Sequence, residues 1–204
     1  EILIGLVGSE MCIRDRHTNA VYGFLNIMFK ILDEEKPEYL TVTFDVHAPT
    51  FRHEMFADYK GTRKPMAEEL RQQVPVIKDV LRAMHIEVIE KAGLEADDLL
   101  GTLSHRCEEK GMDVSIISGD RDTLQLATEH IKIRIPKTKQ GKTEVEDYYA
   151  ADVQERYGVT PKEFIDVKAL MGDTADNIPG VPGVGEKTAT KIIQQYQTIE
   201  NAYE

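Results

Sequence analysis

Acidic side chains follow apolar, strand-like runs at several widely separated places in this chain of 204 residues. Five carboxylates share this position: Asp45, Glu95, Asp97, Asp120 and Asp122. If the runs are parallel strands of one sheet, their carboxyl ends meet at the edge where open α/β sheets bind ligands. Carboxylate oxygens suit Mg²⁺, and the absence of His and Cys from the set disfavours zinc. Acids in one cleft repel unless cations lie between them, so we expect two Mg²⁺ ions about 4 Å apart.

A simpler interpretation exists for the acids around residue 95. Glu95, Asp97 and Asp98 open a helix-like segment, where carboxylates cap free N–H groups and favour the positive end of the helix dipole. For Asp98 the capping and functional interpretations weigh about equally, and an Asp-x-Asp pair alone is common in turns. The metal interpretation is preferred because five acids share the same place relative to predicted strands.

A second chemical feature is the glycine-rich stretch 171–189, MGDTADNIPGVPGVGEKTA. Asp173 and Asp176 are three positions apart and are expected on one face of a helical turn. Gly180, Gly183 and Gly185 then let main-chain N–H groups approach an anion closely. A helix carrying Lys187 and Lys191 follows, and its N-terminus also favours phosphate. The stretch predicts a cradle for a nucleic-acid backbone.

Six segments, in this order, resemble the flap endonuclease and 5′-nuclease family, which includes the 5′→3′ exonuclease domain at the start of bacterial DNA polymerase I. They are 18–24, Phe44-Asp45 with 50–52, 59–63, 95–98, 119–122 and the glycine-rich stretch. The resemblance covers the chain from about residue 17 to its end.

The resemblance implies a Mg²⁺-dependent, structure-selective 5′→3′ exonuclease and flap endonuclease, which acts on DNA with a 5′ end or 5′ flap in primer removal and repair. Mn²⁺ is expected to substitute for Mg²⁺, and K⁺ is expected at the Gly180–Lys187 turn. Asp176 fits the family's direct metal-ligand position better than Asp173. Lys60 and Arg63 are assigned to transition-state stabilisation. Arg52 is assigned a phosphate contact and Tyr59 base stacking, while a polymerase domain is expected as a partner in the natural protein.

Periodicity places these residues on alternating strands and helices. Strands are expected at 39–44, 86–89, 114–118, 131–135 and 143–145. Helices are expected at 19–35, 67–84 with an interruption near Pro75, 96–109, 122–126, 151–157 and 161–171. The alternation predicts an α/β fold with a mostly parallel central sheet and helices on both faces, PIN-like, followed by a helical helix–hairpin–helix-type element. The polar, aromatic and basic segment 49–65 is expected to form an arch or loop.

Three parts follow along the chain. Residues 1–16 (EILIGLVGSEMCIRDR) do not resemble the family and are expected to be non-native, so the family's first metal-site Asp is absent. Residues 17–170 are expected to form the catalytic domain. Residues 171–204 are expected to form the DNA-binding element, truncated at its C-terminus.

Composition is that of an ordinary globular protein, with 41% hydrophobic and 30% charged residues. The net charge of −11 argues against nucleic-acid binding over the whole surface and for local basic patches. Two cysteines offer no disulfide framework, which fits a reducing cytoplasm, and no apolar run is long enough for a membrane helix. A bacterial, cytoplasmic, nucleoid-associated monomer is expected.

Three alternatives remain open at this point. Without the first Asp, the chain could be a DNA-binding module with impaired catalysis. A PIN-type ribonuclease would share the acidic site but not the glycine-rich stretch. An Asp-x-Asp phosphatase would leave that stretch unexplained and would place its acidic pair unusually late. Metal-dependent turnover on flap DNA separates them.

Overall fold

The computed structural model describes residues 12–13, 16–139 and 142–204. The helices are α1 (Asn19–Glu35), α2 (Phe51–Met55), α3 (Glu68–Arg71), α4 (Gln73–Ala83), α5 (Ala96–Glu108), the 3₁₀ helix η1 (Arg121–Leu126), α6 (Ala150–Tyr157), α7 (Pro161–Met171), α8 (Glu186–Tyr196) and α9 (Ile199–Tyr203). The strands are β1 (Cys12–Ile13), β2 (Arg16–His17), β3 (Thr41–Thr43), β4 (Glu87–Ile89), β5 (Val114–Ile117), β6 (Ile131–Lys139), β7 (Lys142–Tyr148), β8 (Gly172–Asp173) and β9 (Ile178–Pro179). The predicted non-native segment 1–16 lies outside the described residues except at 12–13 and 16.

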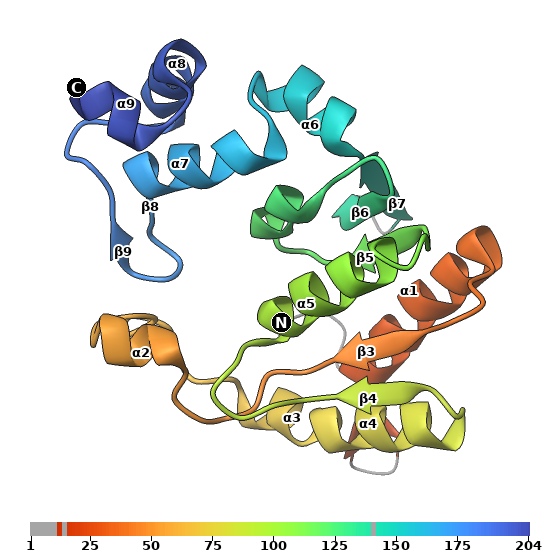
Figure 1. The fold of residues 1–204 in the computed structure, drawn as a ribbon. Coiled ribbons are helices and arrows are strands. Elements are labelled where there is room, and N and C mark those ends of the chain that lie inside the picture. Colours follow the sequence, from red (N-terminus) through yellow and green to blue (C-terminus); the bar gives the residue numbers. More distant parts are fainter. Residues whose placement is uncertain (1–11, 14–15, 140–141) are drawn as a thin grey trace.

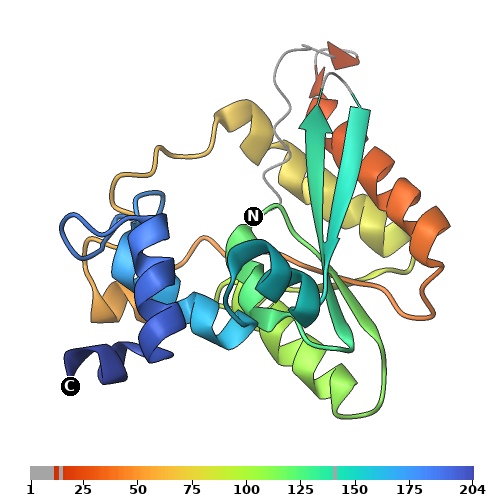
Figure 2. The same cartoon turned by 90° about the horizontal axis from the view of Figure 1, so that it is seen from above.

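Parallel strand pairs lie at the centre of the α/β body (Figure 1). β3 pairs in parallel with β4, and β5 pairs in parallel with β6. β6 also pairs with β7 in a long antiparallel hairpin, which Figure 2 shows as two long arrows beside α1. The segments that follow β3 and β5 therefore reach the side of the molecule where α5 and η1 begin.

Two hydrophobic clusters hold these elements. The smaller one packs Phe24 and Met28 of α1 against Ile77 and Leu81 of α4, over the β3–β4 pair. The larger one includes residues of β5, β6, η1, α6, α7 and α8, and it contains the fully buried Leu124, Ile131, Ile133, Val153 and Ile193. Because α7 and α8 share this cluster with the sheet, hydrophobic packing continues across the predicted domain boundary at residue 170.

Most expected elements are present, and local chemistry explains their ends. α7 begins at Pro161, with Thr160 as the N-cap residue and Glu163 completing a capping box. α6 ends where Gly158 takes a left-handed conformation with φ of 73°. No helix in the described ranges is long and apolar enough to cross a membrane.

Three local expectations differ from the structure. The predicted helix 67–84 breaks at Gln72, and Pro75 lies in the first turn of α4, where backbone N–H groups have no helical partner to lose. The segment 49–65 is not wholly irregular, because it contains α2. Asp173 and Asp176 do not share a helical turn. Instead, β8 and β9 form a hairpin whose turn contains Asp176, with Gly172 opposite Pro179 and Asp173 opposite Ile178.

Candidate active site

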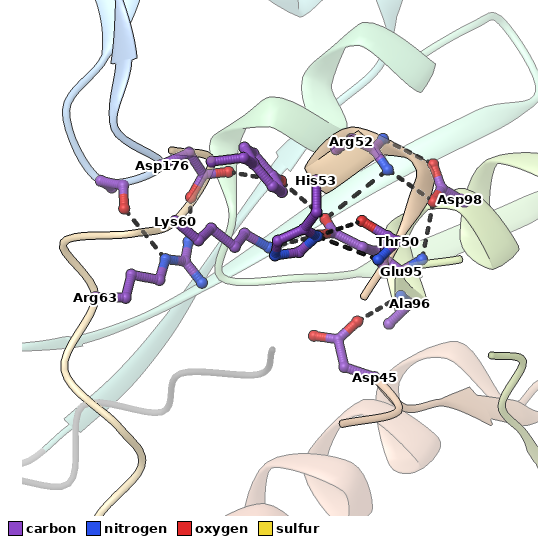
Figure 3. A network of polar contacts seen from close by, with 12 residues as sticks. Asp45, Thr50, Arg52, His53, Lys60, Arg63, Glu95, Ala96, Asp98 and Asp176 are labelled. Atoms are coloured by element: carbon purple, nitrogen blue, oxygen red, sulfur yellow. Dashed lines mark hydrogen bonds and ion pairs between the residues drawn. The ribbon is translucent and has the colours of Figure 1, made fainter. Parts of the chain in front are cut away.

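The acidic site is built around the N-terminus of α5. β3 leads through Phe44, whose N–H donates to the carbonyl of Ile89, directly to Asp45. The carboxylate of Asp45 accepts a hydrogen bond of 2.6 Å from the backbone N–H of Ala96, the first residue of α5 (Figure 3). Sequence-distant acids are thus brought to the same helix end, as the strand pattern predicts.

Asp98 is both a helix cap and an ion-pair partner. Its carboxylate accepts a 2.8 Å hydrogen bond from the N–H of Glu95, which completes a capping box. The guanidinium of Arg52 donates two hydrogen bonds to it, of 2.9 and 2.8 Å. The guanidinium holds the pKa of Asp98 below its ordinary value, and Asp98 raises the pKa of Arg52. The capping interpretation therefore describes Asp98 in this structure. Arg52, which is predicted to contact phosphate, lies at the site and is ion-paired with the carboxylate of Asp98.

Lys60 and Arg63 enter the site from the side away from Asp98, as Figure 3 shows. The Lys60 ammonium donates a 2.9 Å hydrogen bond to Glu95, whose side chain is 13% exposed. The Arg63 guanidinium is ion-paired with Asp176 and donates to the carbonyl of Ala175 at 3.1 Å. Lys60 and Arg63, which are predicted to stabilise the transition state, therefore both lie at the site. Each is paired with an acid that is predicted to be a metal ligand.

The expected stacking role of Tyr59 does not fit its position. The side chain is 5% exposed, with its ring edge against His53 at a centroid distance of 5.2 Å. Its hydroxyl oxygen lies 3.1 Å from a carboxylate oxygen of Glu95 and 3.1 Å from one of Asp176, so the two carboxylates share its one O–H donor. Burial, followed by these two carboxylates, raises the pKa of the phenol well above its ordinary value. A ring enclosed in this way presents no face to a nucleobase.

Asp97 connects the acids of α5 with those of η1. Burial raises the pKa of Asp97, and the like charges of Asp120, Asp45 and Glu95 raise it further. Asp120 caps η1 by accepting a 2.9 Å hydrogen bond from the N–H of Asp122. Among the described residues, neither Asp97 nor Asp120 makes an ion pair with a lysine or arginine, whereas Glu95, Asp98, Asp122 and Asp176 each make one.

Lys168 is a residue of the site that the sequence patterns do not reveal. Its ammonium, on α7, lies 3.0 Å from Asp122 and 2.9 Å from Asp173. Burial raises the pKa of Asp122, and Asp120 adds to this effect while Lys168 opposes it. Burial also acts to raise the pKa of Asp173, but Lys168 and the N–H groups of residues 175 and 176 lower it overall. A lone lysine on an amphipathic helix gives no sequence signal for this bridging role.

The three glycines of the predicted phosphate cradle have different surroundings. A Cβ on Gly180 would lie 2.3 Å from the carbonyl carbon of Met171, so this glycine serves backbone packing and not an open anion site. Gly183, with φ of 81°, and Gly185 have open space where a Cβ would be. Lys187 and Lys191 are exposed on α8 and, with Arg156, line a hollow between α6 and α8. The accessible part of the cradle is thus 183–191.

Whether these acids suit a divalent cation depends on donor type, charge and distance. In the described part of the chain, no three His, Cys, Asp or Glu side chains are close enough together to hold an ion, so the predicted ligands are not preassembled into one cluster. The donors are nevertheless all carboxylate oxygens, which suit Mg²⁺. In the described part of the chain, Asp97 and Asp120 have no lysine or arginine as an ion-pair partner, and the like charges of Asp45 and Glu95 help to raise the pKa of Asp97. In donor type and charge the residues fit a divalent cation.

Comparisons with known proteins agree in family and fold. The family model "5′-3′ exonuclease, N-terminal resolvase-like domain" matches residues 10–158, and "5′-3′ exonuclease, C-terminal SAM fold" matches residues 159–204. DNA polymerase I of Bacillus caldotenax is 51% identical over 185 residues, which are 91% of this chain and 21% of that protein. The chain spans about a fifth of the length of the curated relatives it matches.

Solved structures of one phage protein are similar to the whole fold. The T5 D15 protein crystallised with metal ions matches with a TM-score of 0.74 and 26% identity, over 88% of this chain and 70% of that one. A T5 D15 flap endonuclease complex with DNA and metal ions matches with a TM-score of 0.73 and 25% identity, over 88% of this chain and 68% of that one. The α/β body with a C-terminal helical element is therefore a resolvase-like 5′-nuclease fold.

Proposed function

The chain belongs to the 5′-3′ exonuclease family, and on that premise we propose that it is a Mg²⁺-dependent, structure-selective nuclease. It hydrolyses DNA phosphodiesters near a 5′ end or at the base of a 5′ flap, as primer removal and repair require. The single observation that carries this proposal is that acidic and basic side chains from different segments lie at one site. Asp45 is hydrogen-bonded to the first N–H of α5, directly after Glu95, and from another segment the Lys60 and Arg63 cations pair with Glu95 and Asp176.

Seven acids are proposed to hold the ions: Asp45, Glu95, Asp97, Asp120, Asp122, Asp173 and Asp176. Asp97 supports this most strongly, because it is half-buried and the like charges of Asp120, Asp45 and Glu95 add to the effect of burial in raising its pKa. When bound, the ions would supply Lewis-acid activation of the phosphodiester and of the attacking water. Mn²⁺ is proposed to substitute for Mg²⁺, since both suit oxygen ligands.

Lysine and arginine side chains of the chain are proposed to stabilise the negative charge of the DNA phosphates. Lys60 and Arg63 lie on carboxylates in this structure, and the same side chains would turn to the scissile phosphate, whose negative charge grows in the transition state. Arg52 is proposed to orient a neighbouring phosphate, because its planar guanidinium suits two phosphate oxygens as it now suits Asp98. Lys60 and Arg63 are thus the proposed catalytic residues.

Duplex DNA behind the cleavage point is proposed to contact Gly183, Gly185, Lys187 and Lys191, with K⁺ at the Gly180–Lys187 turn. Gly183 and Gly185 are exposed with open space where a Cβ would be, and Lys187 and Lys191 are exposed in the first half of α8, which supports this. Such contacts go to the backbone, so binding should be independent of sequence and sensitive to salt.

We also propose the wider setting of the chain. A polymerase domain accompanies it in the natural protein, since its curated relatives are bacterial DNA polymerases I of about five times its matched length. The chain acts as a monomer in the bacterial cytoplasm. Residues 17–170 are proposed as the catalytic part and 171–204 as the duplex-binding part; residues 1–16 are proposed to be non-native, although the family match begins at residue 10.

The test is cleavage of a 5′-flap DNA labelled at the flap, with Mg²⁺ and with EDTA in parallel. Release of the flap with Mg²⁺ alone is expected. Binding without release would identify a DNA-binding module with impaired catalysis. A folded sample that neither binds nor cleaves would refute the proposal, and cleavage of RNA without affinity for duplex DNA would favour a PIN-type ribonuclease.

A further inference from the structure

The tip of the β8–β9 hairpin contacts the segment that carries the two catalytic cations. The N–H of Lys60 donates a 2.8 Å hydrogen bond to the carbonyl of Asp176. The side-chain amide of Asn177 donates a 2.8 Å hydrogen bond to the carbonyl of Asp58. With the bonds of Arg63 to residues 175 and 176, these contacts form what we call the junction, between residues 58–63 and 175–177.

The junction fixes unusual backbone conformations on both of its sides. Lys60 has φ of 56° and Asn177 has φ of 58°, both left-handed and neither a glycine. Asn tolerates this region, but a lysine adopts it only where surrounding contacts determine the conformation. Lys60 bonds through its N–H to Asp176, through its carbonyl to the N–H of Arg63, and through its ammonium to Glu95; the ammonium also lies over the Tyr59 ring. The N–H bond to Asp176 is the one of these contacts that ties the backbone of Lys60 to the hairpin.

The hairpin is itself held rigidly at its other end. A Cβ on Gly172, which has φ of 72°, would lie 2.3 Å from the backbone nitrogen of Gly180, so the two strands meet backbone to backbone. The N–H of Val181 donates a 2.8 Å hydrogen bond to the carbonyl of Leu170 at the end of α7. The glycine-rich turn that leads to Lys187 begins at this closed base. The hairpin thus joins the proposed duplex contact to the proposed catalytic cations.

We propose that Asn177 is a positioning residue that sets where the duplex is cut. Through the carbonyl of Asp58 it holds the 58–63 segment on the hairpin, so that Lys60 and Arg63 lie at a fixed distance from the duplex-binding turn. This inference rests on the proposed nuclease function. Loss of the side-chain donor leaves the duplex contact intact but lets the cations move relative to it, which slows cleavage and spreads it over neighbouring phosphodiesters.

The test uses Asn177→Asp, which keeps the size and the tolerance for a left-handed backbone but removes the N–H donor and places a carboxylate oxygen against the carbonyl of Asp58. Asn201→Asp is the matched control, because Asn201 makes a similar 2.8 Å amide bond, to the carbonyl of Tyr196, on the exposed α9. Both proteins are compared with the unaltered chain in single-turnover flap cleavage, in flap affinity, in product mapping at single-nucleotide resolution and in thermal unfolding.

For Asn177→Asp we expect a rate about 10- to 100-fold lower, because small misplacement of catalytic groups has such effects. Flap affinity should change less than twofold, and minor products one or more nucleotides from the main cut should increase. In the protein without DNA, the Lys60 amide hydrogen should exchange about tenfold faster by NMR, since it bonds to the displaced hairpin tip. Asn201→Asp should leave the position of the cut and the exchange rate of the Lys60 amide unchanged.

An unchanged rate and product pattern in folded Asn177→Asp would overturn the inference, as would unchanged exchange at Lys60. If the unaltered chain does not cleave, the proposed function fails, and the exchange measurement alone then decides whether Asn177 holds the junction. A parallel drop of affinity and rate with no change in product position would show a role in binding and would also overturn it.

Discussion

Replacing the glycines at the base of the β8–β9 hairpin tests how rigidly the site is built. Gly172 combines two constraints, because its φ of 72° and ψ of −179° lie in a region essentially limited to glycine and a Cβ would meet backbone atoms at 2.3 and 2.6 Å. Backbone strain costs roughly 1–3 kcal/mol, and overpacking against atoms that cannot rotate away costs roughly 1–3 kcal/mol more. Gly172→Ala should therefore lower the free energy of unfolding by about 4 kcal/mol.

Two other glycines separate these costs. Gly111 has φ of 77° but open space around a Cβ, so Gly111→Ala should cost only about 1 kcal/mol, from the left-handed backbone. At Gly180 a Cβ would lie 2.3 Å from the carbonyl carbon of Met171 without positive φ, so Gly180→Ala should cost roughly 1–3 kcal/mol, from overpacking.

Urea unfolding followed by circular dichroism at one temperature gives all three values, provided that the slopes agree. The order Gly172→Ala, then Gly180→Ala, then Gly111→Ala is expected. If Gly172→Ala costs no more than Gly111→Ala, the close backbone approach does not constrain the hairpin and the argument for its rigidity is wrong.

Three further predictions concern charge. Asp97→Asn should weaken Mg²⁺ binding in calorimetry by roughly tenfold or more, whereas Asp113→Asn, an exposed acid beside a histidine, should not; equal affinities would contradict the metal assignment. Lys187→Ala should reduce the slope of log affinity for flap DNA against log salt by about 0.9, and an unchanged slope would remove this lysine from the interface. Glu35 lies between the cations of β6, and Glu35→Gln should cost about 2 kcal/mol of stability at pH 7, against less than about 1 kcal/mol for the more exposed Glu34→Gln. Burial acts to raise the pKa of Glu35, but its cation and hydroxyl partners lower this pKa overall. The contribution of Glu35 to stability is therefore complete above the ordinary pKa of 4.5 and is lost as the pH falls through the lowered pKa. If the stability difference between the unaltered chain and Glu35→Gln persists fully in acid, this reasoning is wrong.

Sequence patterns predict those parts of the fold whose signals are local. The 161–171 helix is predicted to the residue because Thr160, Pro161 and Glu163 begin it and Gly172 ends it within one short stretch. The strand ends that deliver Asp45 and Asp120 are also predicted, since short β-branched runs are distinctive.

The predictions that fail depend on contacts distant in sequence. The acidic turn 173–176 is expected as helix from its spacing, but it forms the tip of a hairpin that is held by residues 58–63. Tyr59 is enclosed by partners 36 and 117 residues away, which no local pattern encodes. Lys168 is placed between two acids by the packing of α7 on η1, so its role also appears only in three dimensions.

The distribution of charge, and not its sum, decides what this chain can bind. A net charge of −11 suggests repulsion from DNA, but part of the negative charge is already compensated at the site by Arg52, Lys60, Arg63 and Lys168. On the proposed function, Arg52, Lys60 and Arg63 exchange a carboxylate for a phosphate, and the desolvation cost of the exchange is small because both partners are anions. A divalent cation on the released carboxylates would favour that exchange. Acidic composition is therefore compatible with the proposed DNA-directed function, because the acids of the site pair with the cations that this function assigns to phosphate.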